Sequence, residues 1–384
     1  MRVRFAGYDE REQRKLAALD AHIEHMFAAA GDCQPDLSWW RASLQAIDPA
    51  LDAEWSADAG LVVRSDVRGL CPLVERIVAR APIGTSLSAG RPGSPLTPLL
   101  ARIQRTLGVD LGRARVRVGF GRGHLLDVVL YLPGGTACDE EQVAAEELVW
   151  GLLGERRAHD WIGGVDVAPV ARGGPLRVVG GASEADNALP LSELVATIDA
   201  ASSGLHAELP RAPAWATPSD PDWTLFELEP EPRVDWPAQD DLLMTTTCVP
   251  ELLKCYLEGA SFSSVRFSRH AERFFHLKYE ASGSFEARHA QRIGLEDRLD
   301  AALRRACAGA VVGGGLGLRY AYVDLALGEL DRSVSVVRDV GREQGLPLRS
   351  WLQPFDTDWQ DEWVELHADA PPPPPAISGV VTAV

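Results

Sequence analysis

The first half of the chain combines helical and strand patterns of apolar residues. Apolar positions recur at helical spacing over 10–29, and a further helix is expected over 139–153. Apolar positions alternate over 116–120 and 126–132, on either side of a Gly-Arg-Gly turn, which predicts an antiparallel hairpin. Helices mixed with such a hairpin favour an α+β domain over a doubly wound sheet, and we expect this domain to span residues 1–206.

The segment 207–241 has a different character. It holds seven prolines and a dense set of acidic residues, together with Trp215, Trp223 and Trp236. Proline-rich acidic chain is stiff and solvated, which predicts a linker. Tryptophan prefers burial, however, so we expect parts of the segment, 223–226 above all, to lie against a domain as a strand or strap.

The pattern over 242–368 predicts a second domain. Strands are expected over 242–249, 274–280, 318–327 and 350–355 and near 363–366, with a helix over 330–344. Strand-helix-strand-strand-helix-strand is the ferredoxin-like order, a mainly antiparallel sheet with two helices on one face. Its first helix is either 250–258 or 295–306. Residues 369–384 form a tail that begins with five prolines, typical of an extended polyproline II rod, and ends apolar.

Composition and charge narrow the possible partners. The 384 residues include 38 basic and 55 acidic side chains, a formal net charge of −17, which argues against nucleic acid and anionic membranes as partners. The longest suggestive uncharged run, 306–318, is shorter than the roughly 20 residues of a membrane-spanning helix, and no signal-peptide core follows the first residues. Six scattered cysteines without a C-x-x-C pair indicate reduced thiols, so we expect a cytoplasmic protein without metal or cofactor.

Two groups of residues could bind a small ligand. The first is a basic patch that could hold an anion through bidentate guanidinium contacts, with a solvated surface as the alternative: Arg266, Arg269, His270 and Arg273. His276 and Lys278 fall on the polar side of their strand, which indicates a solvated face. The second combines a glycine-rich connection from helix to strand with one face of the next strand: Gly313, Gly314, Gly315, Tyr320, Tyr322 and Asp324. Core packing is the alternative for its side chains.

Two functions follow from these patterns. The first is a non-enzymatic interaction or regulatory protein, such as an adaptor, antidote or sensor component, with a protein partner. Its extended segments would bind that partner through the three tryptophans and through Val381, Thr382 and Val384 at the end of the tail. An exposed linker could also make it a regulated protease substrate. The second function is a small-ligand or anion-binding protein, or an enzyme, with its site between the domains near 313–317.

Overall fold

The structure is a computed structural model, and it falls into two compact units. Unit 1 comprises Met1–Arg14 and His206–Val384, and unit 2 comprises Lys15–Leu205. The residues that the structure describes are 4–5, 21–30, 36–49, 51–56, 60–65, 74, 77–78, 87–89, 93–134, 137–170, 187–217, 222–359 and 362–374.

Unit 1 is built on an antiparallel sheet that has eight strands in the described residues. Their order is β1-β15-β14-β11-β13-β12-β10-β9, and every neighbouring pair is antiparallel. The strands are β1 (Arg4–Phe5), β9 (Thr224–Glu227), β10 (Leu242–Thr247), β11 (Arg273–Glu280), β12 (Gly309–Gly317), β13 (Tyr320–Leu327), β14 (Ser350–Pro354) and β15 (Glu362–Glu365). The strand predicted over 223–226 is thus observed as β9, hydrogen-bonded to β10.

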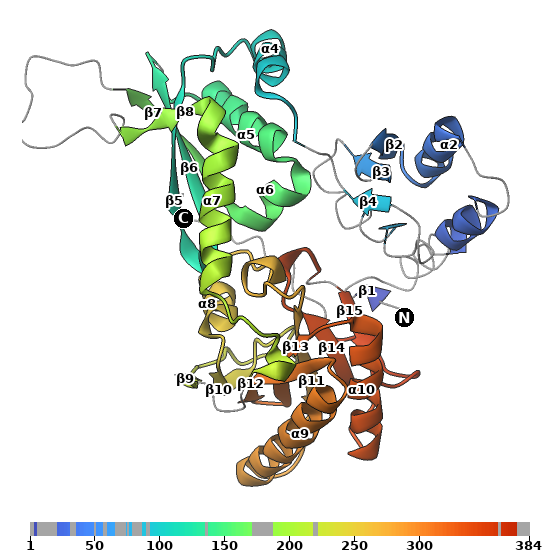
Figure 1. Ribbon diagram of the computed structural model, residues 1–384. Helices are drawn as coiled ribbons and strands as arrows, with labels where there is room; N and C mark the ends of the chain where they lie inside the picture. The colour runs from blue at the N-terminus through green and yellow to red at the C-terminus, as the bar shows by residue number, and fades with distance from the viewer. Residues whose placement is uncertain are drawn as a thin grey trace, which may run out of the picture. The chain divides into compact units, whose positions relative to one another are not determined.

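Two helices cover one face of this sheet, α9 (Phe285–Arg305) and α10 (Leu330–Glu343), which lie side by side in Figure 1. Leu295, Leu299 and Leu303 point from α9 into the main core of the unit, at the four-residue spacing that places them on one helix face. The chain between β11 and β14 runs strand-helix-strand-strand-helix-strand, with α9 as the first helix. The shorter helix α8 (Pro250–Glu258) precedes β11 and is not part of this series.

The opposite face of the sheet is lined by aromatic and polar side chains. Its cluster of buried apolar residues contains Tyr320, Tyr322, Trp351 and Trp363. Residues 228–241, which we call the strap, lie against this face. Phe226 of β9 and Leu228, the first residue of the strap, pack on the same cluster. The position of the strap determines the candidate site described below.

Unit 2 also combines helices with sheets, which confirms the α+β class. A four-stranded sheet has the order β7-β6-β5-β8, and a three-stranded one the order β2-β3-β4. The strands are β2 (Leu51–Ser56), β3 (Gly60–Ser65), β4 (Leu87–Ala89), β5 (Arg115–Phe120), β6 (Leu126–Pro133), β7 (Ile162–Val170) and β8 (Leu189–Pro190). Residues 21–30, which overlap the helix predicted over 10–29, are helical, and the labelled helices are α2 (Leu37–Ile47), α4 (Leu96–Leu107), α5 (Asp139–Leu153), α6 (Glu155–Trp161) and α7 (Leu194–Glu208). The predicted hairpin is confirmed as β5 and β6.

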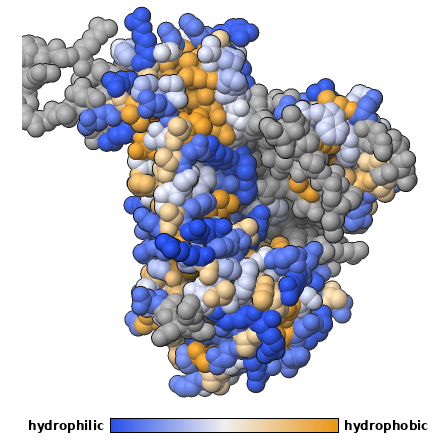
Figure 2. Space-filling view, in the orientation of Figure 1, coloured by the Kyte–Doolittle hydropathy of each residue, from blue (hydrophilic) through white to orange (hydrophobic). Residues whose placement is uncertain are grey.

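The visible surface differs between the two units. Hydrophobic residues of unit 2 gather over α5 and α7, whereas the visible surface of unit 1 is mainly hydrophilic (Figure 2). Within the part of the chain that the structure describes, no helix is both long and apolar enough to cross a membrane.

Candidate functional site

The covered face of the unit 1 sheet brings together polar and charged side chains from two neighbouring strands. Strand alternation places His276, Lys278 and Glu280 of β11 on this face, opposite Asp324, Tyr322 and Tyr320 of β13 in the same order. Lys278, Tyr320 and Tyr322 are fully buried, and His276 and Asp324 are 4% exposed. The solvated face predicted for His276 and Lys278 is therefore wrong, because the strap covers it.

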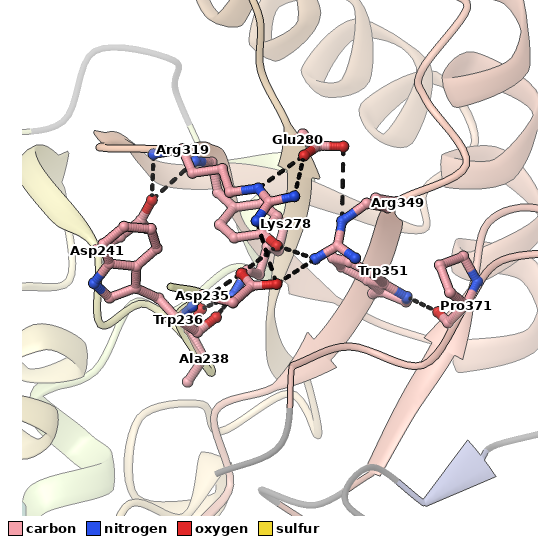
Figure 3. Close-up of polar contacts among 11 residues, drawn as sticks. Asp235, Trp236, Ala238, Asp241, Lys278, Glu280, Arg319, Arg349, Trp351 and Pro371 are labelled. Atoms are coloured by element: carbon pink, nitrogen blue, oxygen red, sulfur yellow. Dashed lines mark hydrogen bonds and ion pairs between the residues drawn. The ribbon is translucent and has the colours of Figure 1, made fainter. Parts of the chain in front are cut away.

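Lys278 holds the strap on the sheet. Its Nζ donates to the carbonyl oxygens of Trp236 at 2.5 Å and Ala238 at 2.8 Å, and it lies 4.1 Å from the ring centroid of Tyr320 (Figure 3). Burial lowers the pKa of Lys278 to about 7, although Asp241 and other strap carboxylates favour its charged form. An ammonium whose donors are directed at backbone carbonyls is held as an anchor and is not free to meet a substrate.

Asp241, at the end of the strap, fixes the turn between β12 and β13. Its Oδ2 accepts from the backbone N–H groups of Arg319 at 2.7 Å and Tyr320 at 2.8 Å. Its Oδ1 accepts from the hydroxyl of Tyr322. These three hydrogen bonds replace the water that the Asp241 carboxylate loses through its complete burial.

Asp235 of the strap connects the buried Tyr320 to Arg349 (Figure 3). It accepts from the Tyr320 hydroxyl at 2.6 Å and from Arg349 at 2.7 Å. Burial would raise its pKa, but these partners and its other hydrogen bond keep the pKa below the ordinary value. Arg319 lies 2.7 Å from Glu280, and Arg349 lies 3.6 Å from the same carboxylate. Two guanidinium groups therefore bridge a strap carboxylate to a strand carboxylate.

Asp324 and His276, which face each other on β13 and β11, are also buried. Gln239 donates to Asp324 Oδ1 at 2.9 Å, and burial raises the pKa of Asp324 to about 7. Burial, with the positive charge of Lys278, lowers the pKa of His276 to about 3, so its ring is neutral at physiological pH. The side chain of Gln353, the residue that pairs with His276 across β11 and β14, partly offsets this by favouring the charged ring.

The glycines of the predicted connection lie inside strand β12, so the prediction of a flexible link is wrong. A Cβ at Gly313 would lie 2.7 Å from Asp324 Oδ2, and one at Gly314 would lie 1.9 Å from Glu296 Oε1. At Gly315 it would lie 2.5 Å from Leu242. These positions require glycine because neighbouring atoms occupy the place of a side chain on both faces of the strand.

The predicted basic patch does not form as one exposed surface, because Arg266 is buried and only Arg269 of its four residues is exposed. Arg266 is fully buried and donates to the carbonyl of Ser261. Arg269 Nη1 lies 3.5 Å from the carbonyl of His206, and His270 Nε2 lies 3.3 Å from the carbonyl oxygen of Pro210. Arg273 lies instead over the ring of Trp359, 6.0 Å from its centroid. Three of these basic residues contact segments that are distant in sequence, and the idea of an exposed patch that includes Arg266 is wrong.

The predicted interaction residues differ in exposure. Trp215 is half-buried, and its ring would lie 2.8 Å from a Cβ at Gly328. Trp236 is 8% exposed and donates from Nε1 to the carbonyl of Glu231 at 3.0 Å. Trp223 is 49% exposed, immediately before β9. Val381, Thr382 and Val384 lie outside the described residues.

Strand β9 forms one end of the sheet, and its outer backbone groups follow from its register. The N–H of Leu228 donates to Leu243 O, so these two residues form a hydrogen-bonded pair. Hydrogen-bonded and non-hydrogen-bonded pairs alternate in an antiparallel ladder, and Leu225 and Glu227 therefore occupy non-hydrogen-bonded pairs with β10. Their N–H and C=O groups point away from β10, toward the outer edge. Leu225 is 53% exposed.

A small pocket opens beside the end of β9. It has a volume of about 270 Å³ and lies between the strap and α8. Its lining includes the apolar Leu228, Leu242 and Leu257, and the acidic Glu229 and Asp240. Within the described residues, no group of three or more His, Cys, Asp or Glu side chains is placed to hold a metal ion.

The buried network and the open edge suit different tasks. The network around Lys278 is closed and internally bonded, so it can hold the strap, whereas the edge of β9 can pair with another strand. Sequence reasoning missed Lys278 and Leu225; the alternation of β11 and the Trp-x-Leu spacing at 223–225 were the available signals. In comparisons with known proteins, the chain matches no family model, no curated protein and no solved structure.

Proposed function

We propose that this protein is a non-enzymatic interaction protein of the cytoplasm that binds an extended segment of a partner protein by strand addition to β9. The observation that carries the proposal is the outer edge of β9, where the backbone groups of Leu225 and Glu227 point away from β10. An adaptor, an antidote or a sensor component would each use such an edge. The free state of four cysteines in the described residues supports a reducing compartment.

The exposed side chains beside this edge support the same proposal. Sheet edges in soluble proteins are usually guarded by charges, prolines or covering segments. Trp223 is 49% exposed and Leu225 is 53% exposed, so two large apolar side chains stand beside the unpaired backbone. Aromatic and aliphatic anchors next to backbone donors and acceptors are what a partner strand needs for both affinity and register.

We also propose that the core of unit 1 is ferredoxin-like. The support is the strand order β14-β11-β13-β12, with α9 and α10 as the two helices of the series. In this view β10 and β9 extend the sheet on one side, and β15 and β1 extend it on the other. The extension by β9 creates the proposed docking edge.

The ligand-binding or enzymatic alternative has less support. Neighbouring side chains leave no room for a Cβ at Gly314. The Lys278 ammonium donates its hydrogen bonds to two carbonyl oxygens of the strap. A catalytic group must reach a substrate atom, and these groups reach only the protein itself. We therefore assign the buried network a structural role in the proposal.

A proline at Leu225 tests the proposal. Leu225→Pro removes an outward N–H without removing a hydrogen bond between β9 and β10, and edge strands tolerate proline. Leu225→Val keeps the N–H and is the matched control. Affinity capture from the native host, with chemical cross-linking, should recover a partner cross-linked near β9 with the wild type and with Leu225→Val, but not with Leu225→Pro. Equal recovery with all three proteins would refute strand addition at this edge.

A truncation tests the predicted role of the tail separately. A chain ending at Pro374 lacks Val381, Thr382 and Val384 but keeps Pro371, whose carbonyl accepts from Trp351 Nε1 at 2.6 Å. If the partner binds β9, this truncation should leave capture unchanged. Loss of the partner with the truncation alone would move the interaction to the tail.

A further inference from the structure

The pocket beside β9 has an apolar wall and an acidic rim. Leu228 and Leu242 line it from the sheet side, and Leu257 lines it from α8. Leu257 is 50% exposed, which leaves apolar surface open to solvent. The volume of about 270 Å³ is below the roughly 300–1,000 Å³ of pockets for drug-sized ligands and suits one long side chain.

The charge of the rim is negative. Arg233, the one basic residue that lines the pocket in the described part of the chain, lies 3.2 Å from Glu231 and 3.2 Å from Asp240, so it is already shared between two carboxylates. Tyr256 donates its hydroxyl to Asp240 as well. Glu229 is exposed and has no ion pair within the described residues. A cation entering the pocket would therefore meet a carboxylate that no other cation neutralises.

The position of the pocket relates it to the edge of β9. Leu228 follows β9 directly and packs on the strap side of the sheet, as Phe226 does. A strand added to β9 would run about 4.8 Å away from it, with alternate side chains on the strap side. Where that strand passes Leu228, its strap-side residue would lie at the mouth of the pocket.

We propose that this pocket takes the basic side chain of the partner strand, an arginine or a lysine. The inference rests on the proposed strand addition to β9 and adds the chemistry of the partner. The aliphatic stem of the basic residue packs on Leu228 and Leu257, and its charged end pairs with Glu229. The partner segment is thus extended, apolar at the positions beside Leu225, and basic at the position beside the pocket.

Synthetic peptides can test this with the full-length chain. The probes are fluorescein-labelled eight-residue peptides of alternating threonine and valine, carrying one arginine at each position in turn. A matched series carries citrulline, which has nearly the same shape without the charge. Fluorescence anisotropy should show one or two arginine positions at which the arginine peptide binds about tenfold tighter than its citrulline partner, corresponding to about 1.4 kcal/mol. This advantage should shrink as salt is raised.

Variants of the chain separate the possible outcomes. Glu229→Gln should remove most of the preference for arginine, whereas Glu343→Gln, the same change at an exposed position on α10, should leave it intact. Citrulline and arginine peptides that bind equally well, with binding lost in Leu225→Pro, would overturn the inference about the pocket and leave strand addition standing. Failure of every peptide to bind would count against both proposals.

Discussion

Replacement of Gly314 by alanine is the most direct test of how β12 is packed. An added Cβ would lie 1.9 Å from Glu296 Oε1, 2.8 Å from Arg292 Nη1 and 2.8 Å from the backbone oxygen of Tyr322. The carboxylate of Glu296 is the end of a flexible side chain, but it is paired with Arg292, whose side chain is only 5% exposed. The backbone oxygen of Tyr322 belongs to the neighbouring strand and cannot move away alone. The substitution must therefore shift both the ion pair and the strand.

The expected cost follows from two opposing effects. Overpacking of a close-packed site costs about 1–3 kcal/mol, and displacing one partner of a buried ion pair adds to this. Alanine loses less backbone entropy than glycine on folding, which returns about 0.5–1 kcal/mol. We expect Gly314→Ala to lower the free energy of unfolding of unit 1 by about 2–3 kcal/mol.

Urea unfolding monitored by hydrogen exchange measures this change in unit 1 separately, through peptides covering β12 and β13. The matched control is Gly294→Ala on α9, where an added Cβ meets nothing within 4 Å. Since alanine is the better helix former, this control should raise stability by about 0.5–1 kcal/mol. If Gly314→Ala unfolds at the same urea concentration as the wild type, the close packing of the glycine strand is wrong as an explanation.

Three further predictions concern the covered face and the strap. Burial raises the pKa of Asp324 to about 7, above its ordinary value of 3.8. The folded state therefore still binds this proton at pH values where the unfolded state has lost it, and the stability that the bound proton contributes is lost as the pH rises toward 7. Asp324→Asn should therefore flatten the fall in unfolding free energy between about pH 4 and pH 7, by up to about 4 kcal/mol, and an unchanged pH profile would contradict the assignment. Lys278→Met leaves two strap carbonyls unpaired at about 1–3 kcal/mol each, so strap amides should exchange at least about tenfold faster while α9 amides do not change, and equal exchange would contradict the anchoring role. Limited trypsin digestion should cut within 207–241 first, after Arg233, because the next residue, Val234, is 95% exposed; a strap that is spared while other sites are cut would refute this.

Several elements of unit 1 could be predicted because their residues carry a clear period. The strand predicted over 274–280 is confirmed as β11, and the helix predicted over 330–344 is confirmed as α10, each to within one residue. Helical periodicity alone could not decide whether 250–258 or 295–306 is the first helix of the ferredoxin-like series. The choice between α8 and α9 depends on which helix joins β11 to β12, and that is set by pairings distant in sequence.

The glycine strand could not be predicted from local preference. Glycine weakens isolated strands and favours turns, so 313–317 indicates a connection when it is considered alone. The stabilising contacts come from elsewhere in unit 1: Thr245 Oγ1 donates to Gly314 O at 3.1 Å, and Arg292 and Glu296 cover the opposite side. Only the tertiary arrangement shows that the absence of side chains permits this packing.

The covered face was missed for a related reason. Lys278 alternates with apolar residues, which is equally typical of a solvated face and of a polar face covered by another segment. The covering segment lies about forty residues earlier, and its acids were interpreted as a feature of solvated chain. Asp235 and Asp241 instead bind Arg349, Tyr320 and the turn after β12.

The placement of the strap also accounts for the open edge of the sheet. A polar face with a buried lysine must be covered by groups that satisfy it, and the carbonyls and carboxylates of residues 235–241 do so. The chain that reaches this position passes first through β9, which takes the last place in the sheet beside β10. Within the described residues no further strand pairs with β9. The segment that closes the polar face thus leaves its own preceding strand with an unpaired edge, and the proposed partner strand would complete the ladder there.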